Sequence, residues 1–308
     1  MSNIRITETR KGYVAAALGA VFYGSSGLFV KLAQSSGLTT LDLLIVQHLV
    51  AVPTLWMICL IKYKKDLRIN KQNLIKLLLL GGVLTSLVNI QYYESFKFLD
   101  ISMATIILYT YPILLALISY VFLKQRPSRI TIISLLVAFG GCILVLNLFN
   151  TRASISFYGI LLGFGAALGY ALFSIFVESI DSKIPPFVFI TYSSSFAFLG
   201  YLLLNPPMGL IQAGISSHQL GIAVILAFVC QVPPNLLLYI AIRSIGAVRT
   251  SVITNIEIPT AALLGYWFYG ETLNVIQLLG VLLVIGGILF MKNGEFLITM
   301  IHNYIRKK

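Results

Sequence analysis

Apolar runs of about 20 residues recur along the whole chain, and short polar stretches separate them. A helix needs about 20 mostly apolar residues to cross the hydrocarbon core of a bilayer. The pattern therefore predicts an all-α integral membrane protein with ten transmembrane helices. The expected spans are residues 13–32, 41–61, 74–96, 101–123, 130–149, 158–178, 187–204, 218–242, 247–269 and 274–292.

The segment after the tenth span, residues 293–308, reads "NGEFLITMIHNYIRKK". It is too short and too polar to cross a bilayer. Its apolar residues share one face of a helix, so we expect an amphipathic tail lying on the cytoplasmic membrane surface.

Composition and charge agree with a membrane location. Only 10% of the residues are charged, whereas soluble domains carry about 25%. A net charge of +12 would suggest nucleic acid in a soluble protein, but basic residues between spans chiefly set orientation. If the N-terminus is cytoplasmic, all of the 22 basic residues except Lys31, Lys97 and Arg152 fall on the cytoplasmic side. We therefore expect both termini in the cytoplasm, a cell-membrane location and no nucleic-acid partner.

The chain also shows an internal repeat when it is shifted by 147 residues. The coinciding pairs include Tyr23 with Tyr170, Tyr92 with Tyr239, and Pro112 with Pro259. The halves 1–150 and 151–292 then hold five spans each. Because five is odd, the second half is inverted relative to the first, and inverted repeats are typical of secondary transporters that work by alternating access.

The ends of the two halves are similar in sequence. They read "FLDISMATIILYTYPILLALISYVFLKQRPSRITIISLLVAFGGCILVL" (98–146) and "SIGAVRTSVITNIEIPTAALLGYWFYGETLNVIQLLGVLLVIGGILF" (244–290). With a proline in mid-span and paired glycines after it, these stretches resemble the EamA-like members of the drug/metabolite transporter superfamily. Glu271 fits the family's Gly-Glu pattern, whereas the first half has Lys124 and Gln125 there. The resemblance implies a ten-helix fold of two inverted repeats and transport of small metabolites such as amino acids, nucleotide sugars, choline or drugs.

Glu257 is the first candidate site residue, because it lies near the middle of the ninth span. A charged side chain at that depth costs ~2.5–3.5 kcal/mol on insertion scales. Helical spacing places Thr250, Thr254, Glu257 and Ala261 on one stripe. We expect Glu257 to be a proton site or a partner for a cationic substrate. The alternative is a protonated glutamate that joins two helices by a hydrogen bond.

The eighth span carries a second polar stripe, because Gln231, Asn235 and Tyr239 are spaced four residues apart. Pro233 and Pro234 interrupt the same helix, and transporters place such interrupted backbone beside a cavity. The alternative is polar contact between helices. Pro112 and Pro259 each remove one backbone hydrogen bond, so we expect helix bends there as well.

The remaining candidates for the substrate or proton pathway are Asn89, Tyr93, Glu94, His48, Tyr23 and Tyr170. Glu94 lies near a span end, which favours an interfacial role. A lone histidine such as His48 is more often a helix contact than a functional group. Tyrosines are also common packing and interface residues, although a ring of them beside a carboxylate would suit a quaternary ammonium ion.

Together these patterns favour a secondary active transporter of a small metabolite, most simply an exporter of amino acids or related compounds. The alternative is a transporter of a cationic amine such as choline. A channel or a membrane enzyme is less favoured, because the chain lacks a phosphate-binding loop and the HExxH and G-x-S-x-G motifs. We expect no cofactor and no metal, a monomer or homodimer in the lipid bilayer, and protons as the candidate coupling ion.

Overall fold

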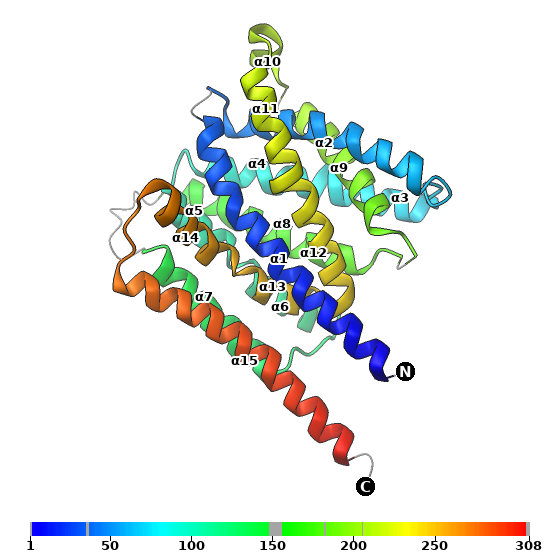
Figure 1. Ribbon diagram of the computed structural model, residues 1–308, viewed down its shortest axis with the longest axis vertical. Coiled ribbons are helices and arrows are strands. Elements are labelled where there is room, and N and C mark those ends of the chain that lie inside the picture. The colour runs from blue at the N-terminus through cyan, green and yellow to red at the C-terminus, as the bar shows by residue number, and fades with distance from the viewer. Residues whose placement is uncertain (1, 35–36, 148–155, 182, 205, 306–308) are drawn as a thin grey trace.

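The computed structural model describes residues 2–34, 37–147, 156–181, 183–204 and 206–305, and every regular element within them is helical (Figure 1). The expected boundary between the halves at residues 150 and 151, the end of the fifth span and residues 306–308 lie outside the described residues.

The helices follow the order that the sequence predicts. The first half contains α1 (Ser2–Gln34), α2 (Thr40–Lys62), α3 (Lys71–Leu77), the π-helical segment η1 (Leu78–Thr85), α4 (Ser86–Ser95), α5 (Ile101–Leu108), α6 (Tyr111–Val121) and α7 (Arg129–Val145). The second contains α8 (Phe157–Glu178), α9 (Pro186–Leu204), α10 (Met208–Ala213), α11 (Ser217–Ile225), the π-helical segment η3 (Leu226–Gln231), α12 (Val232–Ile245), α13 (Ala247–Thr254), α14 (Glu257–Tyr269) and α15 (Val275–Ile305).

Seven helical stretches of the described chain are long and apolar enough to cross a membrane. They are Leu41–Lys62, Lys71–Ser95, Ile101–Val121, Phe157–Glu178, Pro186–Leu204, Ser217–Ile245 and Val275–Gly294. The other three expected spans coincide with α1, α7 and the pair α13–α14. The tail is helical too, but α15 runs into it without a break, so it is continuous with the last span rather than a separate element (Figure 1).

The main helix contacts of one half have equivalents in the other half. α1 packs along α12, α13 and α14, and α8 packs along α4, α5 and α6 in the same way. α2 packs on α9, and α7 lies along α15 on the outside of the bundle (Figure 1). The cavity described below is therefore enclosed by helices of both halves.

Two kinds of irregular backbone also recur in both halves. α5 and α6 are separated at Tyr109–Thr110, and α13 and α14 are separated at Asn255–Ile256. The segment η3 occupies the place of η1 when the chain is shifted by the repeat length. π-helical turns and broken helices are often found at functional sites, and here they lie at mid-span in each half.

The four prolines lie directly after these irregularities. Pro112 is the second residue of α6, Pro259 is the third of α14, and Pro233 and Pro234 follow the first residue of α12. Proline is tolerated in the first turn of a helix because the N–H it lacks has no partner there. These prolines therefore accompany two-residue turns, at which Thr110, Asn255 and Ile256 keep right-handed helical dihedral angles, or π-helical turns.

Candidate functional site

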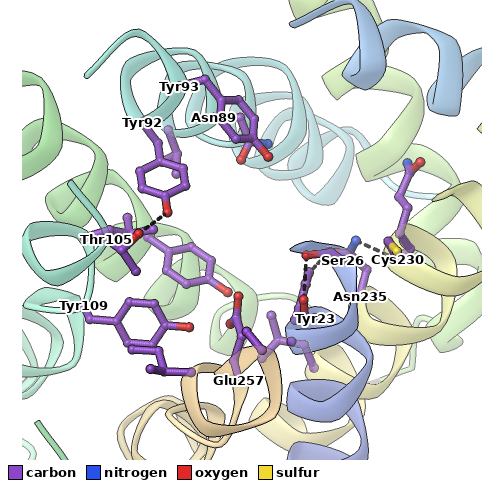
Figure 2. Close-up of a pocket in the computed structure, with 18 of the residues that line it drawn as sticks. Tyr23, Ser26, Asn89, Tyr92, Tyr93, Thr105, Tyr109, Cys230, Asn235 and Glu257 are labelled. Carbon is purple, nitrogen blue, oxygen red and sulfur yellow. Dashed lines mark hydrogen bonds between the residues drawn. The ribbon is translucent and has the colours of Figure 1, made fainter. Parts of the chain in front are cut away.

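A cavity of about 640 Å³ lies at the centre of the bundle. Its walls come from α1, α2, η1, α4, α5, α6, α7, α8, α9, η3, α12, α14 and α15, so both halves contribute. The volume falls within the range of ~300–1,000 Å³ that is typical of small-molecule sites. Figure 2 shows that its labelled side chains point toward a common space.

Glu257 is the first residue of α14, and its carboxylate faces this cavity (Figure 2). The chain breaks at Asn255–Ile256 and the helix restarts with the glutamate, where the positive end of the helix dipole stabilises a negative charge. The hydroxyl of Tyr109 points toward the carboxylate across the cavity (Figure 2). Tyr109 is buried, with 5% of its surface exposed.

Among its described residues, the cavity wall carries acidic but no permanently basic side chains. Glu257 and Glu271 are the acidic residues among the described lining residues, and no lysine or arginine is among them. Glu257 is partly buried, whereas Glu271 is exposed at the rim. An ionised carboxylate at membrane depth is costly unless it is paired, so Glu257 would be stabilised by a proton or by a cation in the cavity.

A chain of hydrogen bonds connects α1 with the irregular backbone of the eighth span. The hydroxyl of Tyr23 donates to Asn235 Oδ1 at 3.0 Å, and Asn235 Nδ2 donates to the carbonyl of Gln231 at 2.8 Å. The side-chain amide of Asn235 thus adds a donor to the carbonyl that lies just before the proline pair. Gln231 is buried with 5% exposed.

The opposite wall is built mainly from α2, α4 and α9. Asn89 Nδ2 donates to the hydroxyl of Tyr201 at 2.6 Å, and the ring of Tyr201 lies 5.1 Å from that of His48 in an edge-on arrangement. His48 Nδ1 is 2.6 Å from the carbonyl of Leu44. Because a carbonyl only accepts, Nδ1 carries the proton of this hydrogen bond.

Most of the residues predicted from sequence come together at the cavity. Those that line it are Glu257, Asn235, Gln231, Tyr239, Asn89, Tyr93, His48, Tyr23 and Tyr170. Glu94 is not among the lining residues, and its carboxylate instead pairs with Lys97 at 2.7 Å. The expected stripe in the ninth span is also divided: Glu257 and Ala261 line the cavity, whereas Thr254 is buried outside it and contacts the hydroxyl of Tyr111 at 2.7 Å. The two-residue turn at Asn255–Ile256 lies between the two groups.

Sequence reasoning missed several lining residues, including Tyr111, Tyr201, Gln47, Thr85 and Ser193. The chain has 16 tyrosines, and an amphipathic pattern is weak in helices whose surroundings are lipid or protein on every side. Tyr111, which directly precedes Pro112 at the break between α5 and α6, could have been found from that proximity.

A cavity enclosed by long apolar helices is the arrangement expected of a multi-pass membrane transporter. The chain belongs to the EamA-like transporter family, whose model matches residues 10–147 and, separately, residues 157–292.

Relatives agree with this assignment, and a solved structure shares the fold. A protein of Archaeoglobus fulgidus described as an uncharacterized transporter is 25% identical over 283 residues, which are 91% of this chain and 96% of that protein. A second uncharacterized transporter, from Clostridium kluyveri, is 22% identical over 289 residues, 90% of this chain and 92% of its own. A solved crystal structure shares the fold with a TM-score of 0.73 at 14% identity and covers 91% of this chain and 95% of that chain.

Proposed function

We propose that the protein is a secondary active transporter of small amine-bearing metabolites, with export of amino acids or related compounds as the first candidate. The observation that carries the proposal is the composition of the cavity wall: it has the carboxylate of Glu257 and several tyrosines, but no lysine or arginine among its described residues. Such a wall favours a ligand with a positive charge. Glu257 is the proposed partner of the amine, and the proposed proton site when the amine is absent.

The helix breaks favour an amino acid over a simple amine. α6 and α14 each begin beside the cavity, at Tyr111 and Glu257. The positive ends of such half-helices point at the anionic groups of substrates in other transporters. They provide favourable positions for a substrate carboxylate although the described part of the wall has no lysine or arginine.

A cationic amine such as choline is the second candidate. The wall includes the rings of Tyr23, Tyr92, Tyr93, Tyr109, Tyr111 and Tyr170. Aromatic rings attract a quaternary ammonium ion through their electron-rich faces, and such a ligand would need no partner for a carboxylate.

We further propose ten membrane spans arranged as two inverted halves, 1–150 and 151–292, with both termini in the cytoplasm of the cell. Support comes from the packing that is preserved on exchange of the halves, from the matching positions of η1 and η3, and from the two separate family matches. The concentration of basic residues on one side supports the orientation. Alternating access between the two halves, driven by a proton gradient, is the proposed mechanism.

The test uses the full chain in proteoliposomes with an imposed pH gradient. Leucine, the amine that lacks its carboxylate (isoamylamine) and the acid that lacks its amine (4-methylvalerate) form a matched set. We expect transport of leucine or isoamylamine but not of 4-methylvalerate, and leucine alone if the half-helix ends bind a carboxylate.

Glu257→Gln should abolish accumulation driven by the gradient, whereas Glu94→Gln, a change outside the cavity, should leave it intact. Transport of the acid alone, or an unaltered Glu257→Gln variant, would contradict the proposal. Because leucine is one member of a class, the same triplet made from a basic and an aromatic amino acid should be measured in parallel.

A further inference from the structure

The central cavity is open at one end and closed at the other. At the open end, which we call the mouth, Ile101, Tyr269 and Glu271 line the cavity and are exposed. At the closed end the rings of Tyr239 and Phe189 stack 4.0 Å apart, and the hydroxyl of Tyr239 donates to the carbonyl of Ile184 at 3.2 Å. α13 and α14 together run from the closed end to the mouth.

A second cavity of about 220 Å³ lies just beyond the closed end. Ile242 of α12 lines the central cavity and Ile245 lines the second one, so less than one helical turn separates them on that helix. At the end of α8, Val177 lines the central cavity and its neighbour Glu178 lines the second. The wall between the two cavities is therefore thin, and Glu178 lies within it.

Glu178 holds this wall together from α8. Its carboxylate accepts a hydrogen bond from the backbone N–H of Ala247, the first residue of α13. Glu178 is also the last residue of α8, where its charge is unfavourable for the dipole of its own helix but favourable for the N-terminus of α13. The negative charge of Glu178 is therefore stabilised only while α8 and α13 stay in contact.

Arg243 makes a second contact with the end of α8, from α12. It belongs to the last turn of α12 and donates to the carbonyl of Glu178 at 2.9 Å and to that of Ile180 at 2.7 Å. These carbonyls have no partner within α8, so a cation there satisfies them and complements the helix dipole. The end of α8 and the connection between α12 and α13 thus cap each other.

Gly246 permits the carboxylate to approach. Its φ is +88°, in the left-handed region that favours glycine, and an added Cβ would lie 3.3 Å from Glu178 Oε1. Gly214 has a similar φ of +73° but nothing within 4 Å of an added Cβ. Alanine at position 214 would strain the backbone alone, whereas alanine at position 246 would strain the backbone and also crowd the carboxylate of Glu178.

The equivalent helices of the other half are arranged differently. α8 packs on α12 and α13, but the described parts of α1 are not closely packed on α4 or α5, the helices at the corresponding places. The mouth opens beside α4 and α5, where Phe96 and Ile101 line the cavity. Two halves with the same plan thus show one closed and one open end.

We propose that Glu178, Arg243, Gly246 and Ala247 form a clamp that shuts this end of the pathway and must open in each transport cycle. Opening would join the central cavity to the second one. Glu178 is a positioning residue in this scheme, because it acts by holding α13 rather than by touching substrate. The inference rests on the proposed transport function, but its test needs no substrate.

The test measures from which side of the membrane a cysteine in the cavity can be labelled. Ser26, which lines the cavity (Figure 2), is changed to cysteine in a chain whose Cys59, Cys142 and Cys230 are alanine. A membrane-impermeant thiosulfonate is then applied to right-side-out and inside-out vesicles. In the parent, labelling should be fast from the mouth side. Glu178→Ala and Gly246→Ala should increase labelling from the clamp side by about tenfold, as expected for the loss of one charge-assisted hydrogen bond.

Matched variants decide between a gate and a merely structural role. Glu178→Gln keeps an acceptor and should give an intermediate rate, whereas Gly214→Ala and Glu94→Ala should label as the parent does. The proposal is overturned if Glu178→Ala and Gly246→Ala are labelled from the mouth as fast as the parent and are labelled no faster than the parent from the clamp side. Because Glu257 is intact in all of these variants, such a result would leave the proposed function standing. Conversely, if transport does not depend on Glu257 but the clamp variants change the labelling as expected, the proposed function is contradicted and the clamp stands.

Discussion

Gly24 of α1 lies directly against the backbone of Glu257, so that a Cβ at position 24 would come within 2.6 Å of the Glu257 carbonyl oxygen. The same added atom would lie 2.7 Å from Cβ of Thr260. The position of the Glu257 carboxylate therefore depends on the absence of a side chain at position 24 in another helix, which the sequence around Glu257 does not reveal.

Gly24→Ala should displace α14 and lower the free energy of unfolding by about 1–3 kcal/mol, the usual cost of overpacking. Apparent melting temperature in detergent and gradient-driven transport measure the two effects. Gly140→Ala is the control, because an added Cβ there meets nothing within 4 Å. Equal melting temperatures for the two variants would contradict the close contact.

The contact between α7 and α15 provides a second prediction. A Cβ at Gly280 would lie 2.7 Å from the carbonyl oxygen of Gly141, whereas a Cβ at Gly286 on the same helix meets nothing within 4 Å. Small residues allow membrane helices to approach closely. Gly280→Ala should therefore lower the melting temperature and Gly286→Ala should not, and a reversal of that order would show that the two helices are not held in this way.

The pair Tyr23 and Asn235 is suited to a double-mutant cycle. Tyr23→Phe removes the donor of the 3.0 Å hydrogen bond, and Asn235→Leu removes its acceptor. Each single change leaves a polar partner unsatisfied, so we expect a coupling free energy of about 1 kcal/mol between them. Additive effects on the free energy of unfolding would mean that the hydrogen bond contributes nothing to stability.

Glu94 and Lys97 should behave as a surface pair. Lys97 is exposed, the two are three residues apart, and such pairs contribute about 0–1 kcal/mol. Glu94→Gln should leave both the melting temperature and transport close to the parent's values. A loss of transport as large as that of Glu257→Gln would return Glu94 to the list of pathway residues.

Much of the helical order could be predicted, because hydropathy reflects the cost of exposing backbone and polar groups to lipid. Each expected range contains a helix of the described structure. Hydropathy carries no signal for helix interruptions, so it predicts one continuous span with a proline bend where the structure has a two-residue turn between α13 and α14. This turn lies between Thr254 and Glu257.

The cavity residues could be predicted in part, because a polar side chain deep in lipid is conspicuous. Glu257, Gln231 and Asn235 stood out in this way, and all three line the cavity. Tyr201 and Tyr111 did not, because tyrosine suits interfaces, packing and pathways equally. The sequence does not predict the clamp for a related reason. Glu178 lies at a span end, where a charge costs little because it can reach water. Its partner is a backbone N–H, which has no signature in the sequence.

The π-helical segment η3 has a consequence for how the cavity could be altered. A π-helical turn holds one residue more than an α-helical turn. Because the extra residue is accommodated within the turn, removing a single residue from Leu226–Gln231 would restore α-helical geometry while α12 keeps its orientation. Asn235 would then stay on the cavity wall. A one-residue difference in length can therefore be absorbed here without exchanging the groups that a solute meets, whereas in an uninterrupted α-helix it would rotate them by about 100°.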